Sequence, residues 1–195
     1  MKARGTRDRI LEAGLRAFSE KGYLGATTKE IAGKAGVAEL TLFRHFSSKE
    51  KLFEEVIKNY SFLSALKGLL PEIAEMPYKD ALTIIAGRFL ETLTARKDMI
   101  QIMHSEMHRY PRKIHKVYHA FIDGIIRTLA SYFTAMQKKR VLKEFDAESG
   151  ARAFLGMFFS YFNVQELMMG KRYGSVATDR TVREFVKIFI EGTAK

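Results

Sequence analysis

The chain has 195 residues, and its 47% hydrophobic content is sufficient to build a globular core. The formal charge of +11 favours an anionic partner, either nucleic acid or a membrane surface, and the absence of cysteine excludes disulfides, thiolate metal sites and cysteine nucleophiles. No apolar run approaches the length of a membrane span, and no apolar signal core follows the first charged residues, so we expect a soluble cytoplasmic protein.

The first sixty residues are predicted to form four helices. Apolar residues recur at three- and four-residue spacings, which places Ile10 and Phe18 on one stripe of a first helix that Gly22 ends. A hydroxyl of Thr27 or Thr28 can cap the second helix. The expected helices are residues 6–21, 27–36 and 38–45, and a fourth that Ser47 or Ser48 caps and that continues to residue 60 or past Leu63.

The remaining residues are predicted to form five more helices. Pro71 and Pro77 bracket a break, and Pro111 can open a helix. The helical periodicity covers about residues 82–93, 98–107, 111–137, 146–169 and 179 onward. The predicted fold is therefore all-α, with about nine helices.

Two of the short helices are joined through Gly36 with almost no spacer. Two helices joined by a tight glycine-containing turn and braced by a longer helix form a helix-turn-helix, in which the second helix enters the DNA major groove. Gly36 suits the tight backbone of the turn. The pattern thus predicts a compact DNA-binding head.

This stretch resembles the N-terminal signature of the TetR-type transcriptional regulators. The helix before it ends in AFSEKGY, as is usual in that family. The matching positions are Thr28, Ile31, Ala32, Ala35, Gly36, Val37, Thr41, Leu42, Phe43, His45, Phe46, Lys49 and Leu52. The resemblance implies a DNA-binding domain over residues 1–50 and a helical ligand-binding and dimerisation domain over residues 51–195.

The resemblance also implies the roles of individual residues. Thr28 and Lys49 would meet backbone phosphates, and Arg44 could donate to O6 and N7 of a guanine together. Three positions depart from the family pattern. This chain has Ala38, Leu40 and Phe43 where Ser, Gly and Tyr are common in the family. The predicted DNA contacts are Thr28, Lys29, Glu39, Leu40, Thr41, Phe43, Arg44, His45 and Lys49, with sequence-independent help from an N-terminal arm of Lys2, Arg4 and Arg7.

Two properties are expected of residues 51–195. The eighth and ninth helices have wide apolar faces, including Phe154, Leu155 and Phe158, so we expect a homodimer that forms through them, although the core of the same chain also claims part of these faces. A small apolar or amphipathic effector is expected to bind among Met and aromatic side chains and near the Glu166 carboxylate. On its apolar stripe this carboxylate needs a partner, which is either an Arg, Lys or hydroxyl of the same chain or a cationic ligand. The predicted ligand-binding residues are Phe89, Met103, Met107, Tyr118, Phe121, Phe158, Phe162 and Glu166.

An alternative function rests on two histidine pairs, His104 with His108 and His115 with His119. The four-residue spacing would place each pair on one helix face, as in a metal-binding or catalytic helical protein. However, the zinc-protease pattern is absent and basic neighbours would repel a cation. The main hypothesis is a ligand-responsive regulator without enzymatic activity or cofactor, a repressor by resemblance, which binds a palindromic double-stranded DNA operator as a dimer.

Overall fold

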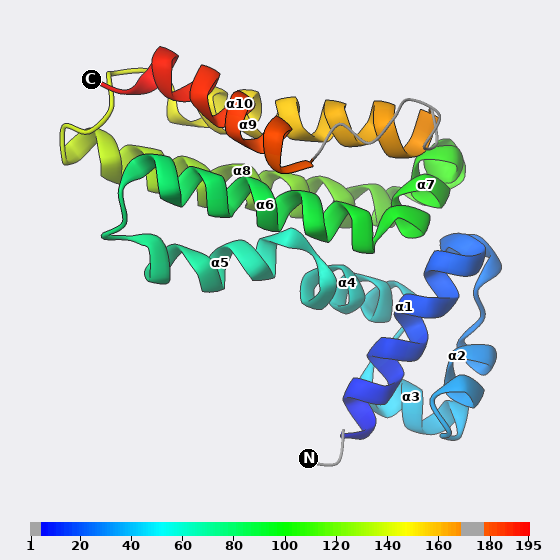
Figure 1. The fold of residues 1–195 in the computed structure, drawn as a ribbon. Coiled ribbons are helices and arrows are strands. Elements are labelled where there is room, and N and C mark those ends of the chain that lie inside the picture. Colours follow the sequence, from blue (N-terminus) through cyan, green and yellow to red (C-terminus); the bar gives the residue numbers. More distant parts are fainter. Residues whose placement is uncertain (1–4, 169–177) are drawn as a thin grey trace. The chain divides into compact units, whose positions relative to one another are not determined.

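The computed structural model describes residues 5–168 and 178–195, and these residues are mostly helical (Figure 1). The prediction of an all-α fold is confirmed. In chain order, the elements are α1 (Thr6–Gly25), α2 (Thr28–Lys34), α3 (Glu39–His45), α4 (Lys49–Tyr60), α5 (Phe62–Ile73), α6 (Tyr78–Ala95), α7 (Lys97–Glu106), η1 (Met107–Arg109), α8 (Arg112–Lys138), α9 (Ala147–Phe162), the π-helical segment η2 (Asn163–Met168) and α10 (Thr178–Thr193).

The chain folds into two compact units. The first combines residues 1–61 with residues 96–121, and the second combines residues 62–95 with residues 122–195. The first unit thus joins α1 to α4 with α7, η1 and the first turns of α8, although these segments are far apart in the sequence. The predicted functional boundary at residue 50 is a different division, and it stays a prediction.

Aromatic side chains form the centre of the first unit. Phe18 of α1 packs edge-on against Phe53 of α4, with ring centroids 5.1 Å apart, and Tyr23 packs against the same ring at 5.2 Å. Phe18, Phe53 and Leu52 are almost completely buried. Burial of one large apolar side chain stabilises a fold by roughly 1.5–3 kcal/mol, so α1 and α4 hold each other in place.

The structure decides where the fourth helix ends, and it shows that the break predicted to start at Pro71 is wrong. The fourth helix does not continue past Leu63, because Ser61 adopts an extended backbone (φ −95°, ψ 167°) and a separate helix, α5, begins at Phe62. Pro71 does not start the break but lies inside α5. Proline has no N–H, so the carbonyl of the exposed Lys67 lacks its intrahelical donor, and α5 ends two residues after Pro71.

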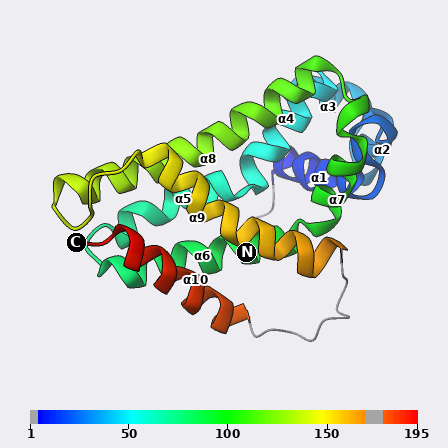
Figure 2. The ribbon, with the colours of Figure 1, turned by 90° about the horizontal axis from the view of Figure 1, so that it is seen from above.

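The second unit buries the apolar face of α9. Phe154 packs against Phe133 of α8 and against Phe189 of α10, with ring centroids 6.4 and 5.0 Å apart. The helices α6, α9 and α10 lie against one another in both views (Figure 2). Phe154, Leu155 and Phe158 are at most 8% exposed because α9 has several neighbours in its own chain, so the core claims these three side chains and a dimer face would have to use others.

Candidate nucleic-acid interface

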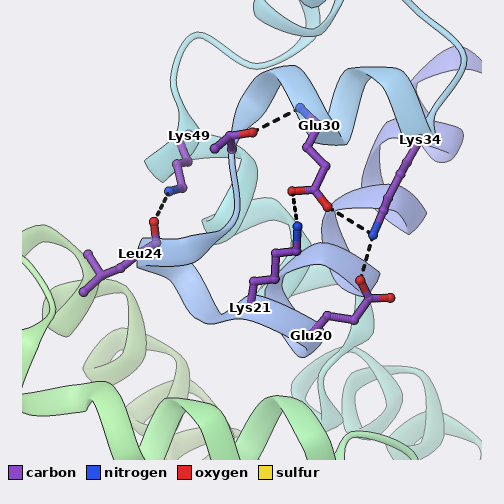
Figure 3. Close-up of polar contacts among 7 residues, drawn as sticks. Glu20, Lys21, Leu24, Glu30, Lys34 and Lys49 are labelled. Atoms are coloured by element: carbon purple, nitrogen blue, oxygen red, sulfur yellow. Dashed lines mark hydrogen bonds and ion pairs between the residues drawn. The ribbon is translucent and has the colours of Figure 1, made fainter.

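The helix α2 is fixed at its start by a side-chain cap and along its length by ion pairs (Figure 3). The hydroxyl of Thr27 accepts a hydrogen bond from the backbone N–H of Glu30 at 3.2 Å, which identifies the capping residue. The Glu30 carboxylate pairs with Lys21 of α1 at 2.8 Å, and Lys34 pairs with Glu20 of α1 at 2.7 Å. The hydrogen bond from Lys21 is the main reason why the pKa of Glu30 is lowered. Together these contacts set the angle between α2 and α1.

The turn between α2 and α3 is built around Gly36, whose φ of 66° confirms the predicted tight conformation. The backbone N–H of Val37 donates to the carbonyl of Ala32 at 3.0 Å and closes the turn. The next helix, α3, is anchored to the core by Leu42, which is completely buried, and is followed by Phe46, which is 2% exposed. The predicted helix-turn-helix is therefore present.

The first turns of α2 and α3 are joined by one hydrogen bond. The Thr28 hydroxyl donates to the Glu39 carboxylate, with 2.6 Å between the oxygens. Ala38 occupies the N-cap position of α3 and provides no side-chain hydrogen bond. The sequence predicts Thr28 and Glu39 as separate DNA contacts, but it does not predict that they bind each other. This bond ties the start of α3 to the start of α2, but it satisfies none of the backbone N–H groups that a capping side chain would accept from.

The solvent-facing side of α3 carries the predicted base-reading residues. Leu40 is 65% exposed and Phe43 is 40% exposed, so both apolar side chains are accessible on this side of the helix. The other predicted contacts fall into two groups: Arg44, His45 and Lys29 are exposed, and Thr41 is half-buried. The accessible face of α3 thus combines a guanidinium group, an imidazole and apolar side chains. Their individual DNA contacts stay predictions.

Lys49 lies at the junction of α1 and α4. Its ammonium group donates to the carbonyl oxygen of Leu24 at 3.5 Å (Figure 3). The same group is 4.6 Å from the centroid of the Tyr23 ring. Burial lowers the pKa of Lys49. Ser48 caps α4 by accepting a hydrogen bond from the backbone N–H of Lys51 at 3.1 Å. Lys49, the predicted phosphate contact, is therefore already oriented by its contacts with Tyr23 and Leu24.

The described part of the N-terminal arm is also engaged within the head. Arg7 forms an ion pair with Glu55 of α4, and its guanidinium group lies 5.3 Å from the centroid of the Phe46 ring. Lys2 and Arg4 lie outside the described residues. Arg7 thus braces α1 against α4 and the end of α3.

The sequence pattern does not reveal a polar cluster that connects α1 to η1. Tyr110 contacts the backbone N–H of Tyr23 and the carboxylate of Glu106 through its hydroxyl, and its ring packs against the Tyr23 ring at 5.9 Å. Gly22 has a φ of 67° and a ψ of 178°, and a Cβ at this position would lie 2.2 Å from the Glu106 carboxylate. The sequence signal that could have indicated this cluster is Tyr23, the tyrosine that ends the AFSEKGY stretch.

The predicted ligand-binding residues are divided between the two units. In the first unit, Met103 is buried and three others pack against the same core. In the second unit, Phe89 packs against Phe62 with ring centroids 4.7 Å apart. The remaining members are Met107, Tyr118 and Phe121 in the first unit, and in the second unit Phe158 and Phe162, which are buried in α9, and the half-buried Glu166 in η2. A shared ligand site stays a prediction.

The histidines are arranged differently from the alternative hypothesis. His104 lies in α7 and His108 in η1, so the predicted helix face for this pair is wrong, because the α-helical repeat ends at Glu106. His115 and His119 do share α8, with ring centroids 6.3 Å apart. Within residues 5–168 and 178–195, no three His, Asp or Glu side chains converge on a possible metal position.

Comparison with known proteins assigns the chain to a family. A family model described as "Bacterial regulatory proteins, tetR family" matches residues 10–56, and one described as "AefR-like transcriptional repressor, C-terminal domain" matches residues 80–192. The uncharacterised HTH-type transcriptional regulator YvkB of Bacillus subtilis (strain 168) is 32% identical over 189 residues, which cover 97% of each chain. The chain belongs to the TetR family.

Solved structures support the same TetR-family fold. A structure from Mesorhizobium loti that is assigned to the TetR family has a TM-score of 0.80 at 22% identity and covers 97% of each chain. The transcriptional regulator FadR of Bacillus subtilis, solved in complex with stearoyl-CoA, has a TM-score of 0.75 at 17% identity and covers 95% of this chain and 98% of its own. In the described residues of this TetR-family chain, no helix is long and apolar enough to cross a membrane.

Proposed function

We propose that the chain is a transcriptional repressor that binds a palindromic operator as a homodimer, and that a small apolar or amphipathic effector releases it from DNA. The main support is the exposed face of α3, which the buried Leu42 and Phe46 anchor to a rigid three-helix head. Membership of the TetR family, whose C-terminal model here is that of a transcriptional repressor, supports the direction of control.

Base reading is proposed to centre on Arg44. Its exposed guanidinium group can make two parallel hydrogen bonds to a guanine in the major groove. The exposed Leu40 can contact a thymine methyl group, and the Glu39 carboxylate can accept a hydrogen bond from the amino group of a cytosine. For Thr28 to donate to a phosphate, its hydroxyl must leave Glu39, so the hydrogen bond between Thr28 and Glu39 competes with the predicted phosphate contact.

Dimerisation is proposed to use the outer faces of α9 and α10. Ile188 of α10 is 58% exposed although it is a large apolar residue. On α9, the small residues Ala153, Gly156 and Ser160 are exposed, and nothing lies within 4 Å of a Cβ built on Gly156. Small residues permit a partner helix to approach closely. A dimer would present two heads to half-sites about 34–36 Å apart.

Effector control is proposed to act through α7, which shares a core with the head. Met99 and Met103 of α7 are buried in the same cluster as Phe18 and Phe53. An effector that binds better to a conformation with differently placed heads would shift the population by its differential affinity. The stearoyl-CoA in the FadR structure makes acyl compounds reasonable first probes, because the residues predicted for this site are mainly Met and aromatic.

The test is selection of binding sites from random duplex DNA by the purified protein at two salt concentrations. The wild type should enrich an inverted repeat, and Arg44→Ala should weaken or change the enriched bases. Arg88→Ala is a matched control, because Arg88 is an exposed arginine of the second unit that pairs only at the surface with Glu91. Retention without any enriched sequence would refute the proposed function.

A further inference from the structure

A strongly basic segment lies outside the helix-turn-helix. Residues 107–122 contain Arg109, Arg112, Lys113 and Lys116 but no Asp or Glu. We refer to these four residues as the α8 basic surface. They occupy η1 and the first turns of α8.

The four cations point into solvent. All of them are exposed, whereas Ile114 in the same turn is completely buried, so the charges lie on the side of α8 opposite the core. Arg109 has a distant partner, Glu106, at 4.0 Å. Within the described chain, the other three form no ion pair with a carboxylate. The surface therefore keeps most of its positive charge.

The α8 basic surface belongs to the same compact unit as the DNA-binding head. The carboxyl group of Glu50 has a lowered pKa, mainly because its own backbone N–H and Ser48 donate hydrogen bonds to it, and to a smaller extent because of the positive charge of Lys113. Lys113 thus lies within electrostatic range of the first turn of α4. Glu50 is adjacent to Lys49, the predicted phosphate contact at that turn.

We propose that the α8 basic surface binds the phosphate backbone of the DNA that flanks each operator half-site. It would act as a second, sequence-independent contact beside the helix-turn-helix. The inference rests on the proposed function, because it assumes that the head docks on DNA. DNA is the favoured partner because the basic surface lies near the start of α4, where Lys49 is expected to contact a phosphate.

A lipid surface fits these residues less well. A helix that lies on a membrane needs an apolar face that can enter the bilayer. None of the exposed large apolar side chains of the described residues lies in residues 107–121, because the apolar side chains of this segment face the core of the first unit. Phosphate groups arranged along a duplex are the anions that such a purely charged surface can bind.

The test compares two variants that lose the same charge. The first carries Arg109→Gln, Arg112→Gln, Lys113→Gln and Lys116→Gln. The control carries Lys138→Gln, Lys139→Gln, Arg140→Gln and Lys143→Gln, which are exposed residues of the second unit. Affinity is measured by fluorescence anisotropy on the selected operator with long and with minimal flanks, between 50 and 200 mM salt, after circular dichroism has shown that both variants are folded.

We expect the first variant to lose affinity for the long duplex by on the order of tenfold, with a salt slope that falls by about 0.9 for each lost phosphate contact. Its affinity for the minimal duplex and its preferred bases should match those of the wild type, and the control should change by less than about twofold. Equal losses in both variants would reduce the effect to net charge and overturn the proposal, as would no loss in either.

Two further binding measurements use random-sequence DNA and lipid vesicles. If the wild type enriches no sequence, the proposed function fails, but the comparison on random-sequence duplexes still tests the basic surface. In that measurement, a larger loss for the first variant supports the inference and equal affinities refute it. Vesicles that contain phosphatidylserine provide the lipid alternative, and binding to them that depends on these four residues, without any effect on DNA binding, would overturn the proposal.

Discussion

The hydroxyl of Tyr110 accepts a hydrogen bond from the backbone N–H of Tyr23 at 3.3 Å and donates one to the carboxylate of Glu106 at 3.2 Å. Tyr23 in turn lies beneath the ammonium group of Lys49 and against the ring of Phe53. The end of α1 is thereby joined to η1 on one side and to the start of α4 on the other. A movement of α7 and η1 would reach Lys49 through two aromatic residues, Tyr110 and Tyr23.

Removal of the Tyr110 hydroxyl is expected to destabilise the protein. Tyr110→Phe leaves a buried backbone N–H without its acceptor and Glu106 without its donor, which should cost about 1–3 kcal/mol. Urea denaturation measures the change. Tyr118→Phe is the control, because no hydrogen bond joins the Tyr118 hydroxyl to another described residue, and it should change stability by less than about 0.5 kcal/mol. Equal effects of both variants would show that the polar cluster contributes nothing.

The backbone of Gly22 is expected to reject any side chain. Its φ of 67° and ψ of 178° lie in a region that is essentially restricted to glycine, and a Cβ would also displace the Glu106 carboxylate. Gly22→Ala should therefore lower the thermal midpoint, with a cost of at least about 1–3 kcal/mol. Gly87→Ala in α6 is the control, because a Cβ there meets nothing within 4 Å, and it should stabilise by up to about 1 kcal/mol. A neutral Gly22→Ala would contradict the described conformation.

Stability is expected to fall as the pH rises from 10 to 12. Burial is the main cause that raises the pKa values of Tyr23, Tyr78 and Tyr132 from 10.0 to about 12. In this range the unfolded chain loses tyrosine protons that the folded chain retains, so each tyrosine lowers the free energy of unfolding by up to about 1.4 kcal/mol per pH unit. The difference is absent below pH 10, where both states are protonated. Urea midpoints at pH 9, 10 and 11 measure the slope.

The variant Tyr132→Phe isolates one contribution to this alkaline slope. The Tyr132 hydroxyl is buried without a hydrogen-bond partner among the described residues. Its removal should leave stability at pH 9 equal or higher by about 1 kcal/mol, and should make the fall above pH 10 shallower. A slope identical to that of the wild type would show that Tyr132 ionises normally in the folded protein.

The proposed dimer face is tested by a charge at Ile188. Ile188→Glu would place a carboxylate in an apolar contact and is expected to weaken dimerisation by at least about tenfold, because an unpaired charge is costly to bury. Sedimentation at several protein concentrations measures the dissociation constant. Ile84→Glu is the matched control, because Ile84 is an exposed isoleucine on α6 of the same unit, and it should leave the dimer intact. A similar loss in both variants, or in neither, would place the dimer face elsewhere.

The head could be predicted from the sequence because its signals are local. The Ser48 cap and the Gly36 turn each depend on residues only a few positions apart. In contrast, Thr28 meets Glu39 across 11 positions and Tyr23 meets Tyr110 across 87, and no periodicity encodes such pairs. The periodicity of the apolar residues predicts that α9 has a buried face, but it does not show that α8 and α10 of the same chain cover that face.

The same limit explains why the sequence leaves the end of the fourth helix open and why the break predicted at Pro71 is wrong. The break between α4 and α5 occurs at Ser61, where neither glycine nor proline marks it. Pro71, which does resemble a stop signal, lies inside α5, two residues before the helix ends. Whether the predicted DNA and ligand contacts are used depends on partners that the chain alone does not contain, so these residues stay predictions.

The shared core of the first unit limits how this protein can be recombined with its relatives. Met99, Met103, Tyr110 and Ile114 are buried in the same cluster as the residues of α1 and α4. A chimera cut at residue 50 would replace these four partners with those of another chain and leave the head on a foreign surface. We therefore expect that a chimera needs residues 96–121 together with the head to carry its DNA preference into another regulator. The two segments to be exchanged are separated in the gene.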